Sequence, residues 1–440
     1  MAAETRSIDN AVLVVVDPND HREADANTEE LRLLVDSAGG RLVDEMHVRR
    51  ETPDARFFIG KGNADEVFVR VQESSADVVI VGEDLSPTQQ RNLEEIATVR
   101  VVDRTQLILD IFAQRARTSE GKLQVELAQL EYLLPRLAGR GIQMSRIGGG
   151  SAGGIATRGP GETKLETDRR RVRRRISVIK DELEEVVKRR SIQNKARRRL
   201  MIPNAALVGY TSAGKSTLLN LLAGSEVEAH ARLFATLDPT TRRVDLDDAT
   251  DPRSRDGHSI ILSDTVGFLR NLPHHLIAAF RATLEEVVEA DFLIHVVDAS
   301  HHFCDEQRRA VMGVLADLGV ENKPTITVFN KSDLVKDQYR LRKLVAETPD
   351  SCYMSALTGE GKQYLVRLID QAAARLAKRI EALIPYDRGD LVALCHERGR
   401  VFGTDYRPDG ILIQVELSDD LRSRIADYEV VGDGAQRKAD

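Results

Sequence analysis

The octapeptide at residues 209–216, Gly-Tyr-Thr-Ser-Ala-Gly-Lys-Ser, constrains this chain more than any other stretch. It fits the pattern G-x-x-x-x-G-K-[ST], follows an apolar run at residues 205–208 and precedes leucines at helical spacing. The pattern predicts a strand, a tight glycine-rich turn and a helix. In such a turn the backbone N–H groups and the positive end of the helix face an anion, which is the geometry of a phosphate-binding loop (P-loop). The alternative is a chance glycine-rich turn, which the flanking strand and helix disfavour.

The P-loop residues are expected to bind the phosphates of a nucleotide together with Mg²⁺. The Lys215 ammonium would reach the β- and γ-phosphates, and the Ser216 hydroxyl would be a metal ligand. The expected phosphate-binding residues are Gly209, Tyr210, Thr211, Ser212, Ala213, Gly214, Lys215, Ser216 and Thr217.

A second pattern, at residues 330–333, indicates which base is bound. It comes after a β-branched run, and the carboxylate of Asp333 could accept hydrogen bonds from guanine N1–H and the exocyclic amine, a donor pair that adenine lacks. A site built on such bonds can reject the wrong base by ~10⁴-fold. Asn330 would brace the loop, and the Lys331 stem would lie over the purine. The backbone of residues 355–357, Ser355, Ala356 and Leu357, would support the base.

Alone, an N-K-x-D tetrapeptide is equally typical of a solvated turn. Here it lies at the end of a predicted strand, about 115 residues downstream of a P-loop. This position predicts that the bound nucleotide is GTP or GDP.

Two segments between these patterns are expected to sense the γ-phosphate. Asp264-Thr265-Val266-Gly267 follows an apolar run; Asp264 would hold Mg²⁺ through water, and the Gly267 N–H would touch the γ-phosphate. Upstream, the segment Phe234-Ala235-Thr236-Leu237 places the hydroxyl of Thr236 within reach of the metal. Such switch loops are ordered by GTP and released after hydrolysis. The expected metal ligands are therefore Ser216, Thr236 and Asp264, and the expected catalytic residues are Lys215, Thr236 and Gly267.

These motifs, in this order, resemble the HflX family, which belongs to the Obg–HflX group of translation-factor-class GTPases. Further matches extend the resemblance over most of residues 11–430; they lie at residues 58–62, 85–87, 103–105, 108–113, 121–130 and 158–163. The resemblance implies a GTPase with bound Mg²⁺ that docks on the large ribosomal subunit. It also implies that stalled or idle ribosomes are separated into subunits under stress.

Two positions bear on the rate of hydrolysis. Phe268 follows Gly267, where small signalling GTPases place a water-orienting Gln, so we expect slow intrinsic hydrolysis, with the missing group supplied by a partner, an ion or another part of this chain. The resemblance implies that the large subunit stimulates the reaction. Family members usually carry Asn where this chain has Ser212, and in related GTPases that Asn is implicated in K⁺ coordination. A shorter Ser places K⁺ activation in doubt, although a neutral polar exchange explains the residue equally well.

The composition favours a cytoplasmic monomer that does not span a membrane. The 440 residues correspond to about three domains. Three cysteines lie far apart without C-x-x-C spacing, which is typical of reduced thiols. The chain begins without an apolar leader and contains no long apolar run.

Shifts in pattern predict four parts. We expect a small α/β domain at residues 1–117, an antiparallel helical hairpin at 118–200 and a P-loop GTPase (G) domain at 201–378. A small α+β domain would complete the chain at residues 379–440. The hairpin helices would be joined by a Gly/Arg-rich loop at residues 139–161, which holds nine glycines.

The hairpin carries an unusual charge for an acidic chain. Residues 164–199 hold fifteen Lys or Arg and six Asp or Glu, whereas the whole chain has a net charge of −7. A concentrated basic element suits docking on a polyanion at one place, so we expect residues 139–175 and the basic helix to contact rRNA. A solvated helix face with a linker is the alternative.

The sequence predicts a GTP-operated ribosome factor. A large-subunit assembly GTPase needs the same contacts and stays open as an alternative. An ATP-dependent RNA remodeller is the third candidate, although no second pair of nucleotide motifs lies outside residues 209–267.

Overall fold

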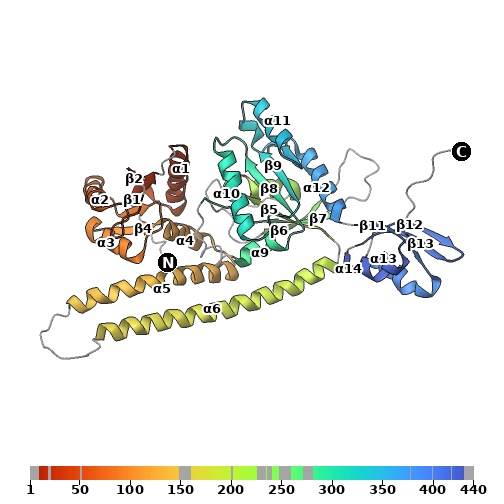
Figure 1. Ribbon diagram of the computed structural model, residues 1–440, viewed down its shortest axis with the longest axis horizontal. Coiled ribbons are helices and arrows are strands. Elements are labelled where there is room, and N and C mark those ends of the chain that lie inside the picture. Colours follow the sequence, from red (N-terminus) through yellow and green to blue (C-terminus); the bar gives the residue numbers. More distant parts are fainter. Residues whose placement is uncertain are drawn as a thin grey trace, which may run out of the picture.

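The computed structural model describes residues 9–17, 21–49, 52–147, 160–199, 202–224, 234, 240–246, 259–270, 281–376, 378–398, 400–417 and 419–430. Figure 1 shows the N-terminal domain beside the G domain, a long helical hairpin running beneath both, and the small C-terminal domain at the opposite end. The fold class agrees with the one expected from the sequence.

The N-terminal domain is a parallel sheet covered by helices. Its strand order is β2-β1-β3-β4, and every neighbouring pair is parallel. β1, β3 and β4 contain continuous apolar runs because helices cover both faces of such a sheet, whereas the edge strand β2 also carries charged residues. The elements are β1 (Asn10–Asp17), α1 (His21–Ala38), β2 (Arg41–Arg49), α2 (Lys61–Ser74), β3 (Val78–Val81), α3 (Pro87–Ala97), β4 (Arg100–Asp103) and α4 (Arg104–Arg115).

The hairpin consists of α5 (Ser119–Ile147) and α6 (Pro160–Arg199), which run in opposite directions (Figure 1). Ile179 is fully buried between the helices and their surroundings. Two ion pairs join the helices: Arg175 with Glu126, and Lys180 with Glu131, at 2.7 and 2.8 Å. The basic helix of 40 residues is about 60 Å long at 1.5 Å per residue.

The predicted loop at residues 139–161 is too long at both ends. α5 continues through residues 139–147, and α6 already begins at Pro160. Two helical glycines, Gly139 and Gly141, cost about 1 kcal/mol each relative to Ala, but the Arg, Gln and Met residues that follow favour a helix. The middle of the predicted loop, residues 148–159, lies outside the described residues.

The G domain is a six-stranded sheet of order β10-β9-β8-β5-β7-β6, in which only β6 runs antiparallel to its neighbour. Its strands are β5 (Asn204–Gly209), β6 (Thr240–Asp245), β7 (Ser259–Asp264), β8 (Phe292–Asp298), β9 (Thr325–Asn330) and β10 (Ser351–Tyr353). Its helices are α7 (Lys215–Ala223), α9 (Arg281–Glu289), α10 (Cys304–Asp317), η1 (Ser332–Leu334), α11 (Gln338–Glu347) and α12 (Lys362–Leu376).

The C-terminal domain is a three-stranded antiparallel sheet of order β11-β13-β12. The alternating pattern at residues 411–417 corresponds to β13, the central strand. The elements are β11 (Lys378–Ile384), η2 (Tyr386–Arg388), α13 (Gly389–Arg398), β12 (Arg400–Arg407), β13 (Gly410–Leu417), α14 (Asp419–Ile425) and η3 (Ala426–Tyr428).

One apolar core joins the N-terminal and G domains. A continuous cluster of buried side chains includes residues of α1 and α4 together with Phe234, Phe268 and Leu269 of the G domain. The rings of Phe112 and Phe234 meet edge to face, with centroids 4.5 Å apart. The two domains are thus held together by apolar contact next to the switch segments. No helix in the described part of the chain has the length and apolar character needed to cross a bilayer.

We predict that Phe112→Ala destabilises the folded protein by about 3–5 kcal/mol, because it removes a buried ring and leaves a cavity between two domains. Phe68→Ala is the matched control: Phe68 is 38% exposed in the same domain and should cost less than about 1 kcal/mol. Urea unfolding followed by circular dichroism measures both. Equal losses in the two variants would contradict the assignment of Phe112 to a shared core.

Candidate nucleotide-binding site

The P-loop lies between the end of β5 and the start of α7, as the octapeptide predicts. Gly214 adopts a left-handed conformation with φ 98°, and a Cβ at this residue would lie 2.2 Å from Asn330 Nδ2. Only glycine therefore allows the loop to pack against the end of β9.

Asn330 ties the P-loop to the base-binding side of the site. Its Nδ2 donates to the Ala213 carbonyl, and its Oδ1 accepts from the Ala356 N–H, both at 2.8 Å. Asn330 is buried, so these bonds are shielded from water. One amide side chain thus fixes two loops that are far apart in the sequence.

Lys215 is buried within the P-loop. Its Nζ donates to the carbonyls of Gly209 and Tyr210 at 3.0 and 2.9 Å. Burial lowers the pKa of Lys215 to about 8, although the nearby Asp264 carboxylate favours the charged form. A phosphate close to this ammonium would favour the charged form further, and the loop carbonyls are the contacts that it would replace.

Two of the three predicted metal ligands lie together. The Ser216 hydroxyl donates to Asp264 Oδ2 at 2.6 Å, and Asp264 is only 1% exposed. Hydroxyl and carboxylate oxygens are the ligand types that Mg²⁺ takes in nucleotide sites, so the donor set fits this ion. The third ligand, Thr236, lies with Ala235 and Leu237 outside the described residues, whereas Phe234 beside them is buried.

Residues 264–270, called switch II below, lie directly on the P-loop. The Phe268 N–H donates to the Gly209 carbonyl at 3.1 Å, and the Thr211 N–H donates to the Phe268 carbonyl at 2.9 Å. A Cβ on Gly267 would lie 2.8 Å from Thr211 Cα and 3.1 Å from Lys215 Nζ. The backbone at Gly267 therefore lies next to Lys215, the predicted phosphate-binding residue, with no room for a side chain.

Phe268 is a core residue in this structure. Its side chain is 1% exposed and belongs to the apolar cluster shared by the two domains. This burial gives a structural reason for the apolar residue after Gly267: the position stabilises the contact between domains. The ring holds no polar group that could orient an attacking water.

The predicted base-binding residues gather beyond the ends of β9 and β10. Lys331 has φ 61°, and its Nζ lies 2.5 Å from Asp298 Oδ2 at the end of β8. Asp333 is exposed, and so is Leu357, whereas Ser355 is buried. The Ser355 hydroxyl accepts from the Thr358 N–H at 3.2 Å and shapes the turn that carries Ala356.

The predicted site residues that the structure describes lie at one edge of the G-domain sheet, except Phe234, which is buried against Phe112 in the core shared by the two domains. β5, β7, β8, β9 and β10 are parallel, so their carboxyl ends meet at that edge. Thr217 lies on the first turn of α7; Thr265 and Val266 belong to switch II, where the Thr265 hydroxyl donates to the Leu207 carbonyl at 2.6 Å.

α1 of the N-terminal domain forms a wall of the candidate site that the sequence does not predict. A pocket of about 230 Å³ lies between α1 and the P-loop, with Glu29 and Glu30 on one side and Thr211, Ser212 and Lys331 on the other. No motif marks this wall, because two glutamates on a helix also suit a solvated face. Burial raises the pKa of Glu30, against the opposing effect of the adjacent Arg104 guanidinium.

We predict that Gly214→Ala abolishes guanine-nucleotide binding, lowering affinity at least 100-fold, because the new methyl group would displace the Asn330 amide. Gly224→Ala is the matched control. Gly224 also has positive φ, at 59°, but a Cβ there has no neighbour within 4 Å. Fluorescent GDP titration measures both variants; similar losses would mean that backbone strain, and not the clash with Asn330, is responsible.

Comparison with known families gives matches along most of the chain. Residues 25–113 match the family "GTP-binding GTPase N-terminal", and residues 115–197 match "GTP-binding GTPase Middle Region". Residues 204–331 match "50S ribosome-binding GTPase". These three ranges correspond to the N-terminal domain, the hairpin and the part of the G domain from β5 to Lys331.

Several relatives and one solved structure are similar to this chain. GTPase HflX of Caldanaerobacter subterraneus is 42% identical over 96% of this chain and 94% of its own length. GTPase HflX of Escherichia coli is 44% identical over 82% of each chain. A GTP-binding protein of Sulfolobus solfataricus, solved with GDP, is 26% identical and covers 84% of this chain and all of its own, with a TM-score of 0.43 that is too low for further argument.

The motifs, their positions at the sheet edge and the full-length similarity lead to one conclusion: the chain belongs to the HflX family of GTPases.

Proposed function

We propose that this GTPase docks on the large ribosomal subunit in its GTP-bound form and separates stalled or idle ribosomes into subunits. The hairpin would contact rRNA, and GTP hydrolysis would release the factor. The match of the G domain to a family described as 50S ribosome-binding supports the choice of partner.

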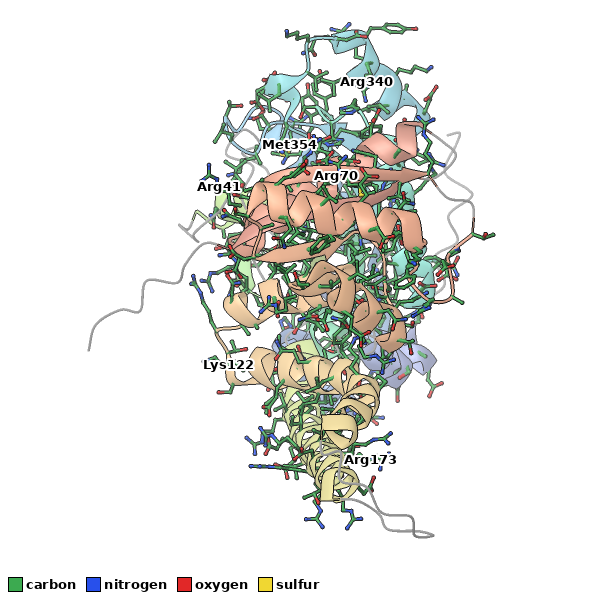
Figure 2. All side chains as sticks on the ribbon, turned by 90° about the vertical axis from the view of Figure 1, so that its left-hand side faces the viewer. Arg41, Arg70, Lys122, Arg173, Arg340 and Met354 are labelled. Atoms are coloured by element: carbon green, nitrogen blue, oxygen red, sulfur yellow. The ribbon has the colours of Figure 1, made fainter. Side chains whose placement is uncertain are left out.

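The observation that carries this proposal is the exposed cationic surface of α6. Arg171, Arg173 and Arg174 are exposed, and within the described parts of the chain no ion pair involves them. Figure 2 labels Arg173 on the hairpin, in the lower part of the view and below the N-terminal domain. Guanidinium groups exposed to water on the hairpin surface are available for phosphates of folded RNA.

Other cations of α6 have a different role. Arg175 and Lys180 are engaged with Glu126 and Glu131 of α5 and hold the two helices together. The helix therefore carries structural cations toward its middle and unpaired, exposed cations closer to its N-terminal end. This division supports an RNA-binding surface better than a uniformly solvated face, on which charges of both signs would alternate.

The residues at the sheet edge fit the proposed cycle. Lys215 would hold the β- and γ-phosphates, and the Gly267 N–H would meet the γ-phosphate. Bound Mg²⁺, held by Ser216 and Asp264, would neutralise phosphate charge. Because Phe268 is buried, the group that orients water must come from elsewhere, and we assign it to the large-subunit complex. The proposed cycle does not depend on K⁺, the ion whose activation is in doubt because the short Ser212 stands where the resemblance implies a longer Asn.

We predict that Asp333→Asn weakens GTP binding at least 100-fold and lets xanthosine triphosphate bind instead, because the amide donates where the carboxylate accepted. Competition against fluorescent GDP measures both nucleotides. Asp337→Asn is the control, since Asp337 caps α11 and lies close in sequence but outside the predicted base site. Unchanged GTP affinity in Asp333→Asn would contradict the base assignment.

We predict that replacing Arg171, Arg173 and Arg174 together by Gln abolishes ribosome separation but leaves GTP affinity within about threefold of wild type. Sucrose gradients of intact ribosomes with a non-hydrolysable GTP analogue measure separation as a fall in the monosome peak. The control removes the same charge from three exposed arginines of the G domain, Arg309, Arg342 and Arg367.

The same gradients distinguish the alternatives. Wild-type protein that binds free large subunits but leaves the monosome peak intact with the GTP analogue would indicate an assembly factor. Separation with ATP alone would indicate an RNA remodeller. Affinity for large subunits that is the same with GDP and with the GTP analogue would contradict a nucleotide-controlled factor of either kind.

A further inference from the structure

Two adjacent buried residues at the junction of β4 and α4 contact three separate parts of the molecule. Asp103 is fully buried and Arg104 is 3% exposed. Charged residues are rarely this buried unless they are paired. Their partners are α1, the hairpin and switch II, so the junction lies where the N-terminal domain, the hairpin and the G domain meet.

Arg104 binds switch II. Its Nη2 donates to the carbonyl of Arg270 at 2.9 Å and also to the carboxylate of Glu30. Its Nη1 donates to Asn27 Oδ1 at 3.0 Å. The two α1 side chains fix the guanidinium plane, so one N–H points at the backbone of switch II.

Asp103 binds the hairpin. Its Oδ2 accepts from Arg136 Nη2 at 2.8 Å, and its Oδ1 accepts from the Gln106 N–H at the start of α4. Arg136 also donates to the Leu85 carbonyl at 2.8 Å, and its guanidinium lies 3.4 Å from the centre of the Tyr132 ring. α5 is therefore fixed to the same dipeptide that holds switch II.

Hydrogen bonds also connect switch II to the P-loop. Switch II is bonded to the P-loop through Phe268, and the Arg270 N–H donates to the Tyr210 hydroxyl at 3.1 Å. Gly267, which is expected to meet the γ-phosphate, is three residues from Arg270. A shift of Gly267 toward a phosphate that carries switch II with it would either move the Arg270 carbonyl or stretch its bond to Arg104.

We propose that Asp103 and Arg104 are positioning residues that couple the state of switch II to the hairpin. When the Arg270 carbonyl moves, Arg104 moves with it because the two are hydrogen-bonded. Asp103 is the preceding residue, so its bond to Arg136 transmits the movement to α5. The ribosomal consequence of this coupling rests on the proposed function, but the coupling itself is a property of the isolated protein.

Linkage makes the proposal testable at the nucleotide. If GTP changes the contacts of the hairpin, then weakening those contacts should in turn change the preference for GTP over GDP, because coupling between two sites is reciprocal. Arg136 bonds with α3, the loop before α3 and Asp103 at the end of β4, and among the described residues it has no hydrogen bond to the G domain. A purely structural Arg136 would leave the ratio of the two affinities unchanged.

The experiment uses the full-length protein without ribosomes. Affinities for GDP and for a non-hydrolysable GTP analogue are measured for wild type, Arg136→Lys and Arg104→Lys, with Arg70→Lys as the matched control. Lysine keeps the charge but lacks the planar fork that makes several bonds at once. Arg70 is also a bidentate arginine of the N-terminal domain, but it binds Glu66 and Asp44 on α2 and β2 and appears on the outer surface in Figure 2.

We expect Arg136→Lys and Arg104→Lys to change the ratio of the two affinities at least fivefold, the lower end of typical coupling factors of roughly 5–150, and Arg70→Lys to change it less than twofold. Hydrogen exchange of residues 123–137 should differ between the two nucleotides in wild type and lose most of that difference in both lysine variants.

Two outcomes overturn the proposal. One is an unchanged ratio in Arg136→Lys, and the other is exchange of α5 in wild type that is the same with either nucleotide. If Arg104→Lys fails to fold, the affinity ratio of the Arg136→Lys variant and the hydrogen exchange of the wild-type protein still test the proposal. Failure of nucleotide-dependent binding to large subunits, with the coupling intact, would instead overturn the proposed function.

Discussion

The contact between switch II and the core shared by the N-terminal and G domains is the constraint on which the remaining structure depends. Phe268 carries the apolar part of this contact, and burying such a ring contributes about 1.5–3 kcal/mol. The backbone on both sides of the ring is bonded to the P-loop at the same time. A nucleotide that alters the P-loop therefore acts directly on the surface that holds two domains together.

This arrangement explains why a catalytic position holds an apolar residue. A Gln in place of Phe268 would place an amide in the apolar cluster, and burying it without partners would destabilise the contact by about 1–3 kcal/mol. The chain therefore keeps a stable domain contact and lacks a water-orienting side chain of its own at this position. This packing is consistent with the proposal that fast hydrolysis depends on a partner.

The nucleotide site could be predicted from the sequence because each of its motifs is local. A P-loop or an N-K-x-D turn needs only a strand, a turn and a few side chains at fixed spacing, so Gly214, Asn330 and Asp264 occur where their patterns place them. Arg104 could not be assigned a role, because its partners lie 77, 74 and 166 residues away in the sequence. The length of the loop predicted at residues 139–161 is too great because the prediction rests on the number of glycines and not on the helix-forming residues beside them.

The two ion pairs of the hairpin have a mechanical consequence. Glu126 and Glu131 are five residues apart on α5, and Arg175 and Lys180 are five apart on α6, yet the helices run in opposite directions. The two ion pairs consequently slant in opposite directions along the hairpin axis. Sliding either helix along the other, in either direction, lengthens one of the two ion pairs. The two ion pairs therefore oppose sliding in both directions, each by no more than about 1 kcal/mol, and so help to keep α5 and α6 in one register.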